Sequence, residues 1–423
     1  MLDIFKIEGP VKLSGDIRIN GSKNAALPIM AATILAPGKS TIQDVPDLAD
    51  INVLKTLLAS LGATVQTRQN GEIDIDTSVI DNPVGEYDIV RKMRASICIL
   101  GPLLARCGRA EVSMPGGCAI GDRPVDIHLR GLRELGAVIN LKNGNIVASA
   151  PRGLTGRNIF LGGPFGSTVL GTANILMAAT LAKGNTVIES AACEPEISDL
   201  AGILNAMGAK ITGIGSPRLT IEGVKSLNPV KYRIIGDRIE AGTFMVAAAI
   251  TKGRLRLKNC NLDHMLAIVD RLEHIGVTID PTDDGCEVTR TVPLKAADIT
   301  TQTYPGFPTD LQAQLMALLA HAKGNSIVTE KIFPDRFMHV AELNRMAANI
   351  RKEGASAIIA GVENLVAAPI MASDLRASAA LVLAAIAAHG TTIINRVYHI
   401  DRGYEKIEKK LNAVGAKITR ESV

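Results

Sequence analysis

The feature that most constrains the fold is a unit of about seventy residues that recurs six times along the chain. In each copy, an Ala- and Leu-rich stretch with helical spacing ends at a glycine that opens a short β-type run. The six glycines, separated by 70, 76, 69, 71 and 66 residues, are Gly38, Gly108, Gly184, Gly253, Gly324 and Gly390. A repeat of this length can hold a small sheet of its own, so the pattern predicts an α/β protein built from six similar units.

Each unit reads as helix, strand, helix, strand, strand. In the first unit, residues 22–35 predict a helix, 40–45 a strand, 49–61 an amphipathic helix and 64–67 a strand. In the last unit, the second helix is expected over residues 403–414. The second helices end in Leu-Gly-Ala or a related sequence, because glycine readily adopts the left-handed conformation that stops a helix. The six endings are Gly62-Ala63, Gly136-Ala137, Gly208-Ala209, Gly276-Val277, Ala348-Asn349 and Gly415-Ala416.

Six such units group more naturally as three plus three than as a rod. We expect a hinge between Asn228-Pro229 and Gly236-Asp237, after the third unit, and a strand in the first residues that pairs with the second half. The predicted domains are residues 21–235, and residues 1–20 together with 236–423. Because ligands commonly bind between domains, we expect the substrate cleft there.

Composition narrows the class of protein. Of 423 residues, 47% are apolar and 21% charged, which is typical of a globular protein. A net charge of +4, with 7 Phe, 5 Tyr and no Trp, argues against nucleic acid as a partner. The cysteines show no C-x-x-C pair, no signal peptide is evident, and the longest uncharged apolar run, Ala377 to Ala388, is too short to span a membrane. We expect a soluble cytoplasmic protein without a membrane partner, and the oligomeric state stays open.

A loop rich in glycine and proline, from Met114 to Asp126, contains a single thiol, Cys118. Its three glycines and two prolines disfavour a regular helix or central strand. Arg123 follows five residues later, and a nearby guanidinium favours the thiolate form of a cysteine. Cys118 is therefore either a buried structural cysteine in a turn or a reactive thiol in a loop that closes over an anionic substrate.

Cations recur near the predicted starts of helices. A cation there faces the positive end of the helix dipole, so six of them in corresponding places favour an anion-binding site over solvated surface charges. These residues are Lys23, Arg94, Arg123, Arg336, Arg376 and Arg402.

Acidic residues near helix starts have two interpretations. Asp237 to Glu240 and Thr309 to Gln312 match capping boxes, in which the side chains bond to the first turn of the helix. Asp310 also ends a loop made rigid by Pro305 and Pro308, which could deliver a general base to a substrate hydroxyl. The sequence is compatible with both roles.

Seven motifs in order resemble the bacterial UDP-N-acetylglucosamine 1-carboxyvinyltransferases, a group of enolpyruvyl transferases. They span essentially the whole chain and are highly specific together. The motifs are Gly21-Ser22-Lys23-Asn24-Ala25-Ala26-Leu27, Met93-Arg94-Ala95-Ser96, the loop from Pro115 to Asp126, Pro305-Gly306-Phe307-Pro308-Thr309-Asp310, Arg336-Phe337-Met338-His339, Asp374-Leu375-Arg376-Ala377-Ser378 and Asp401-Arg402-Gly403-Tyr404-Glu405.

The resemblance implies a fold, a reaction and the absence of a cofactor. The fold would be a two-domain inside-out α/β barrel with three βαβαββ repeats per domain, with the helices packed inward. The reaction would move the enolpyruvyl group of phosphoenolpyruvate to the 3′-hydroxyl of UDP-N-acetylglucosamine and release phosphate, at the start of peptidoglycan precursor synthesis. No metal and no organic cofactor would take part.

The resemblance also assigns roles to residues. Cys118 would protonate the methylene carbon of phosphoenolpyruvate, Asp310 would take the proton of the sugar hydroxyl, and Lys23 and Arg402 would act with them. The phosphoenolpyruvate ligands would be Lys23, Asn24, Arg123 and Arg402. The nucleotide sugar would be held by Arg94, Arg123, Pro124, Val125, Asp126, Ile127, Thr168, Asp310 and Ile332. The cleft would be completed by Arg336, Asp374 and Arg376.

One segment departs from the pattern of these enzymes. Residues 163–172 read Gly-Pro-Phe-Gly-Ser-Thr-Val-Leu-Gly-Thr, in place of a Ser-Val-Gly-Ala-Thr type of loop. Thr168 is placed by aligning residues 178–182, so the uridine diphosphate contacts stay open. Three alternatives remain: a shikimate 3-phosphate enzyme, which lacks such a thiol, an enolpyruvyl transferase for another nucleotide, and a binder that has lost turnover.

Overall fold

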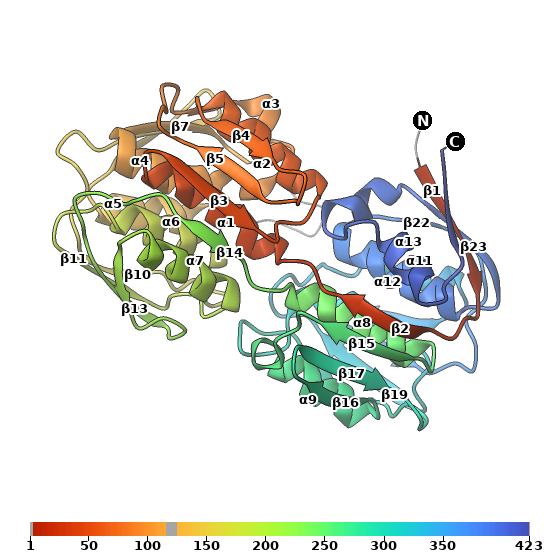
Figure 1. Ribbon diagram of the computed structural model, residues 1–423. Coiled ribbons are helices and arrows are strands. Elements are labelled where there is room, and N and C mark those ends of the chain that lie inside the picture. The colour runs from red at the N-terminus through yellow and green to blue at the C-terminus, as the bar shows by residue number, and fades with distance from the viewer. Residues whose placement is uncertain (1–2, 116–124, 423) are drawn as a thin grey trace. The chain divides into compact units, whose positions relative to one another are not determined.

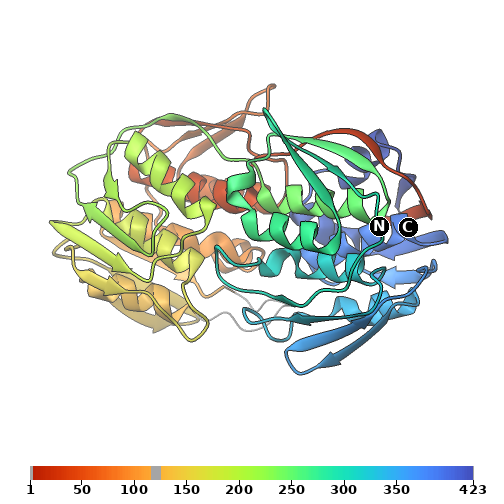
Figure 2. The same ribbon diagram turned by 90° about the horizontal axis from the view of Figure 1, so that it is seen from below.

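The computed structural model describes residues 3–115 and 125–422. These residues fall into two compact units, one formed by residues 21–115 and 125–235 and the other by residues 3–20 and 236–422. We call them the 21–235 unit and the 236–422 unit. Within each unit, helices pack at the centre and sheets form the outside (Figure 1 and Figure 2).

Each unit contains three four-stranded sheets with one common topology. In every sheet an edge strand pairs in parallel with the strand that follows the first helix of the repeat, and the two remaining strands are antiparallel. This is the βαβαββ repeat, so the predicted six-repeat α/β fold is confirmed. In the 21–235 unit the sheets are β14 (Lys231–Arg233), β3 (Lys39–Gln43), β5 (Ile73–Asp76), β4 (Thr64–Thr67); β6 (Val84–Gly85), β7 (Arg109–Ser113), β9 (Asn145–Ser149), β8 (Val138–Lys142); and β10 (Asn158–Phe160), β11 (Asn185–Glu189), β13 (Arg218–Glu222), β12 (Lys210–Thr212).

The 236–422 unit has the same arrangement but takes two strands from the start of the chain. Strand β1 lies between β23 and β24, with Phe5 opposite both Ile394 and Arg420, and β2 pairs in parallel with β15. Its sheets are β2 (Ser14–Arg18), β15 (Arg254–Lys258), β17 (Gly285–Thr289), β16 (Thr278–Thr282); β18 (Ile299–Thr300), β19 (Asn325–Thr329), β21 (Ser356–Ala360), β20 (Asn349–Glu353); and β22 (Pro369–Met371), β23 (Gly390–Asn395), β1 (Asp3–Gly9), β24 (Ile418–Ser422).

The first helix of each repeat forms the core of its unit. In α8 and α12 nearly every side chain is buried, which is typical of a helix that is apolar all round and surrounded by other elements. Glycine allows two of these helices to approach closely. A Cβ on Gly101 would lie only 2.3 Å from the carbonyl oxygen of Asn174, on the neighbouring helix. These first helices are α1 (Lys23–Ala32), η2 (Arg94–Ile99) with α4 (Leu100–Cys107), α6 (Val169–Ala179), α8 (Arg238–Ile250), η4 (Thr309–Leu311) with α10 (Gln312–Leu319), and α12 (Leu375–Ala387).

The second helices are amphipathic with one face exposed, except the one in the third repeat, in which only Ala206 is exposed. They are α2 (Ala49–Ser60), α5 (Asp126–Glu134), α7 (Pro195–Ala206), α9 (Leu266–Ile275), α11 (His339–Arg345) and α13 (Ile407–Ala413). The short helical segments are η1 (Thr33–Leu35), α3 (Tyr87–Val90), η3 (Leu262–His264) and η5 (Val397–Arg402). The elements predicted in the first repeat are found within two residues of their expected bounds when η1 is counted as the end of the first helix. The helix expected over 403–414 spans only Ile407–Ala413, because Lys406 adopts a left-handed conformation (φ +45°) at its N-cap.

Positive φ angles mark the helix ends, with two corrections to the predicted pattern. Glycine has this conformation at five of the six first-helix ends, but in the fourth repeat Lys252 adopts it (φ +51°), one residue before Gly253. Five of the second helices end at a glycine with φ between +96° and +109°, and the fifth repeat uses Ala347 (φ +64°). The predicted ending at Ala348-Asn349 was therefore wrong by one residue. Among the described residues, no helix is long and apolar enough to cross a membrane.

Candidate active site

Asp310 lies in η4, directly before the buried helix α10, and is held by two arginines. Its Oδ1 accepts from Nη1 of Arg336 at 2.8 Å, and its Oδ2 accepts from Nε of Arg376 at 3.2 Å. The side chain keeps 26% of its surface exposed, so solvent or a ligand can reach it. Two guanidinium groups favour the ionised carboxylate, which is the form that accepts a proton.

The capping interpretation of Asp310 is not supported by these contacts. Pro308 holds the N-cap position of η4 and makes no side-chain capping bond, and the Thr309 hydroxyl donates to Glu330 instead. The predicted cap at Asp237 is confirmed, because its carboxylate accepts from the backbone N–H groups of Ile239 and Glu240. The carboxylate of Glu240 accepts from the N–H of Asn20. The full capping boxes were therefore wrong, and the single Asp237 cap was right.

Arg376 is the most deeply buried cation of this group, with 1% of its surface exposed. Burial lowers its pKa, but Tyr404, Asp310 and Asp237 together raise it above its ordinary value, so the guanidinium stays charged. Its Cζ lies 5.3 Å from the ring centroid of Tyr404, whose hydroxyl contacts Thr243 at 2.8 Å. Asp374 is the N-cap of α12 and accepts from the backbone N–H of Arg376, so it holds the helix that carries this arginine.

The 21–235 unit buries an ion pair at the start of α1. Lys23 Nζ lies 3.1 Å from Oδ2 of Asp50 on α2, and both side chains are at most 10% exposed. Ser22 is the N-cap of α1 and accepts from the N–H of Ala25, which fixes the helix start and with it Lys23 and Asn24. The predicted cation is therefore present at a helix N-terminus, with a protein carboxylate beside it.

Arg94 begins η2, near a buried polar cluster. Asn174 of α6 donates to the carbonyl of Ile97 at 2.9 Å, accepts from the N–H of Gly101 at 2.8 Å and contacts Nδ1 of His128 at 3.0 Å. Burial, followed by the charge of Arg94, lowers the pKa of His128 to about 4, so this imidazole is neutral at pH 7. Its Nδ1 therefore accepts from the Asn174 amide.

The predicted nucleotide-sugar residues of this unit lie around the starts of α5 and α6. Val125 precedes α5, and Asp126 and Ile127 open it. A Cβ on Gly163 would lie 2.7 Å from Cδ1 of Ile127, so the glycine-rich segment 163–168 lies against this helix start. Thr168 is the N-cap of α6 and accepts from the N–H of Gly171 at 3.3 Å.

The remaining site predictions divide into three groups. Arg336 precedes α11 by three residues and Arg402 ends η5, so these two do not begin α-helices as expected. Ile332 lies after β19, where its backbone N–H donates to Glu330. Cys118, Arg123, Pro124 and the loop that joins them lie outside the described residues. Among the described site predictions, the structure brings Arg336 and Arg376 each into direct contact with Asp310.

Sequence reasoning missed three polar residues that lie beside predicted site residues: Asp50 and His128 in the 21–235 unit, and Glu330 in the 236–422 unit. Asp50 and Glu330 are acidic residues next to apolar runs, a pattern common in any globular chain. His128 follows the quoted 115–126 loop, and only its burial distinguishes it from a surface histidine. Their partners lie 27, 29 and 46 residues away in the chain, so only the folded structure identifies them.

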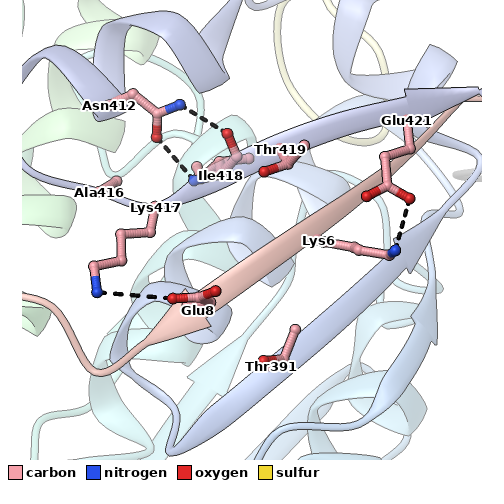
Figure 3. A pocket seen from close by; sticks show the side chains of 9 residues that line it. All are labelled: Lys6, Glu8, Thr391, Asn412, Ala416, Lys417, Ile418, Thr419 and Glu421. Carbon is pink, nitrogen blue, oxygen red and sulfur yellow. Dashed lines mark hydrogen bonds and ion pairs between the residues drawn. The ribbon is translucent and has the colours of Figure 1, made fainter.

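A pocket over the terminal sheet is a poor alternative site. Figure 3 shows its side chains on β1, β23 and β24 and on the end of α13 with the residues that follow it. Lys6 pairs there with Glu421 at 2.7 Å and Lys417 with Glu8 at 3.7 Å. These charges offset one another, and none of the predicted site residues that the structure describes lines this pocket.

Comparison with known proteins decides the family. The sequence pattern of the EPSP synthase (3-phosphoshikimate 1-carboxyvinyltransferase) family matches residues 7–411. The chain belongs to this family. It is 54% identical to the UDP-N-acetylglucosamine 1-carboxyvinyltransferases of Methylacidiphilum infernorum and Gluconacetobacter diazotrophicus, over 99% of both chains in each case. The resemblance predicted from seven motifs is thus confirmed.

Solved structures of other enolpyruvyl transferases share the fold. The enolpyruvyl transferase NikO from Streptomyces tendae superposes with a TM-score of 0.90 at 24% identity, covering 100% of this chain and 99% of that one. EPSP synthase from Acinetobacter baumannii gives a TM-score of 0.75 at 18% identity, covering all of both chains. At these identities the likeness concerns the fold alone.

Proposed function

We propose that this chain transfers the enolpyruvyl group of phosphoenolpyruvate to the 3′-hydroxyl of UDP-N-acetylglucosamine and releases phosphate. The observation that carries this proposal is the 54% identity, over 99% of both chains, to two enzymes named UDP-N-acetylglucosamine 1-carboxyvinyltransferase. The reaction supplies a peptidoglycan precursor. We place it in the cytoplasm, where free thiols stay reduced.

In this proposal, Asp310 is the base for the sugar hydroxyl. During addition, the hydroxyl oxygen bonds to C2 of phosphoenolpyruvate, its proton passes to the carboxylate, and the methylene carbon gains a proton from Cys118. During elimination, that carbon loses a proton and the C2–O bond to phosphate breaks. Arg336 and Arg376 support the proposal because they keep the Asp310 carboxylate ionised and aimed.

The anionic substrate is assigned to the cations of both units. Lys23, Asn24, Arg123 and Arg402 bind phosphoenolpyruvate, and the Asp50 carboxylate supports this by holding Lys23 charged in a buried place. The nucleotide sugar is assigned to Arg94, Thr168, Asp310, Ile332 and residues 123–127. Cations fixed before the reaction stabilise the charge of the tetrahedral intermediate.

A second candidate acceptor is shikimate 3-phosphate, because the matching family pattern is named for the enzyme that uses it. One assay separates the two. The chain is mixed with phosphoenolpyruvate and either UDP-N-acetylglucosamine, UDP-glucose or shikimate 3-phosphate, and phosphate release is followed. We expect release with UDP-N-acetylglucosamine alone. Release with shikimate 3-phosphate only, or with none of the three acceptors, would refute the proposed function.

A further inference from the structure

Glu330 is a fully buried carboxylate at the end of β19, with 0% of its surface exposed. Four groups point hydrogen atoms at it. The Thr301 hydroxyl and the backbone N–H groups of Ile332 and Phe333 reach Oε1 at 2.7, 2.8 and 3.0 Å, and the Thr309 hydroxyl reaches Oε2 at 2.8 Å. The residue thus joins the loop that carries Asp310 to the segment that carries Ile332.

The direction of each of these hydrogen bonds is fixed by the neighbouring groups. Thr309 Oγ1 accepts from Arg336 Nη1 at 3.0 Å, and Thr301 Oγ1 accepts from the backbone N–H of Lys331 at 2.9 Å. Guanidinium and backbone nitrogens can only donate, so each hydroxyl must direct its own hydrogen at Glu330. All four bonds therefore end on Glu330 as acceptor, which is the pattern of an ionised carboxylate.

The same bonds extend from Glu330 to the proposed base. Arg336 Nη1 donates both to Thr309 Oγ1 and to Asp310 Oδ1, at 3.0 and 2.8 Å. With its hydrogen turned toward Glu330, the Thr309 hydroxyl presents a lone pair to Arg336. The guanidinium is then held between this lone pair and the Asp310 carboxylate.

We propose that Glu330 is a positioning residue for the transfer reaction, acting through the Thr309 hydroxyl and Arg336 on the Asp310 carboxylate. This inference rests on the proposed function, in which Asp310 accepts the proton of the sugar hydroxyl. Glu330 itself touches no substrate in this scheme. It sets the orientation of the groups that hold the base.

Glu330→Gln tests the inference with little change in shape. The amide oxygen can keep the three bonds at the Oε1 position, which places the NH₂ group opposite Thr309. The Thr309 hydroxyl must then turn its hydrogen away from residue 330. The carboxylate nearest to it in the sequence is that of Asp310, which can accept this hydrogen. Since small misplacements of a catalytic group cost up to about a hundredfold, we expect kcat to fall about tenfold to a hundredfold. The KM for UDP-N-acetylglucosamine should stay within about twofold, because the Ile332 N–H keeps its partner.

Three further variants separate positioning from general damage. Thr309→Val should lower kcat as Glu330→Gln does, and the double variant should be no slower than Thr309→Val alone, because both changes interrupt one chain of bonds. Thr309→Ser keeps the hydroxyl and should retain kcat. Thr301→Val removes a bond to the opposite oxygen of the same carboxylate, so it should lower the melting temperature and leave kcat within about twofold.

The outcomes are distinguishable from a failure of the proposed function. If the wild type releases phosphate, two results would overturn the positioning role. One is a wild-type kcat in Glu330→Gln. The other is a double variant whose loss of kcat is the product of the losses in the two single variants. If the wild type releases no phosphate, the proposed function fails, and a crystal structure of Glu330→Gln decides the geometry. We expect the Arg336 to Thr309 bond to be broken there, and its persistence at 3.0 Å, with the Asp310 bond at 2.8 Å, would overturn the inference.

Discussion

At the scale of single residues, Asp310 combines exposure with fixed orientation. Asp310→Asn removes the proton acceptor and leaves the shape of the side chain unchanged. We expect both substrates to bind and kcat to fall about a hundredfold to ten-thousandfold, the usual range for a lost general base. Phosphate release gives kcat, and calorimetry gives the affinity for UDP-N-acetylglucosamine.

The control for this variant is Asp335→Asn, in the segment between β19 and α11. The side chain of Asp335 is 87% exposed and pairs only loosely with Lys352 at 3.5 Å, so its loss should leave kcat unchanged. Turnover of Asp310→Asn at the wild-type rate would remove Asp310 from the role of base.

Reaction with an electrophile tests the assignment of Cys118, which lies outside the described residues. Fosfomycin, an electrophilic mimic of phosphoenolpyruvate, requires a reachable thiolate. Burial raises the pKa of Cys98 to about 12 and raises the pKa values of Cys107 and Cys193, and Cys260 and Cys286 are buried. We therefore expect one adduct, on Cys118, and none in Cys118→Asp. Finding the added mass on any other cysteine in a peptide digest would contradict the assignment.

What the sequence could predict at this scale was the set of residues in recognisable motifs, such as Lys23, Asp310 and Arg376. The residues that contact them could not be predicted from the sequence. Asp50 approaches Lys23 only because α1 and α2 pack together, and Glu330 reaches Thr309 only because β19 ends beside η4. Such contacts depend on tertiary packing, which local spacing does not encode.

At the scale of helices and strands, the repeat was predictable because its helix ends share one requirement. A second helix ends with a residue at positive φ whose N–H bonds to the carbonyl three residues back, as Gly415 bonds to Asn412 and Ala347 to Asn344. Glycine signals this requirement in the sequence and alanine does not, which explains why the fifth ending was misplaced by one residue.

Ala347→Gly should therefore stabilise the protein. A left-handed conformation costs a residue with a Cβ about 1–2 kcal/mol, and the greater unfolded-state freedom of glycine costs roughly 0.5–1 kcal/mol, so a net gain of about 0.5–1 kcal/mol is expected. An upward shift of the urea midpoint, at unchanged slope, would show it.

The reciprocal change in the sixth repeat is the matched control for this prediction. Gly415 has φ +108°, and a Cβ there would lie 3.4 Å from the nearest atom, the carbonyl oxygen of Lys12, which is an ordinary contact. Gly415→Ala should thus destabilise through the backbone conformation alone. A less stable Ala347→Gly protein would show that packing at this helix end outweighs the backbone effect.

At the scale of the whole molecule, the two units differ in how they are completed. Every strand of the three sheets in the 21–235 unit comes from residues 39–233. The 236–422 unit needs β1 and β2 from the start of the chain, and β1 is a central strand bonded on both sides. The sequence indicated that the first residues form a strand, but a register such as Phe5 opposite Ile394 joins positions too distant for any local pattern to specify.

This difference predicts how fragments of the chain behave. Residues 21–235 should fold alone, with a cooperative urea transition, because no strand of their sheets is missing. Residues 236–423 alone lack the buried side chains of Phe5, Ile7, Leu13, Ile17 and Ile19. At about 1.5–3 kcal/mol each, their loss removes roughly 10 kcal/mol, which is comparable with the entire stability of a typical domain. This fragment should therefore show no cooperative transition.

Restoring the missing strands should restore folding. Asp3 lies opposite Ser422 in the β1–β24 pair, so a short glycine-serine linker can join residue 423 to residue 1 in a polypeptide of residues 236–423 followed by 1–20. We expect this rearranged chain to unfold cooperatively in urea with native-like circular dichroism. The same chain with Phe5→Asp and Ile7→Asp should not, because both side chains are fully buried and belong to β1, the strand between β23 and β24. Cooperative folding of residues 236–423 without the first twenty residues would show that β1 and β2 contribute little to this unit, although β1 is a central strand and Ile17 of the edge strand β2 is buried.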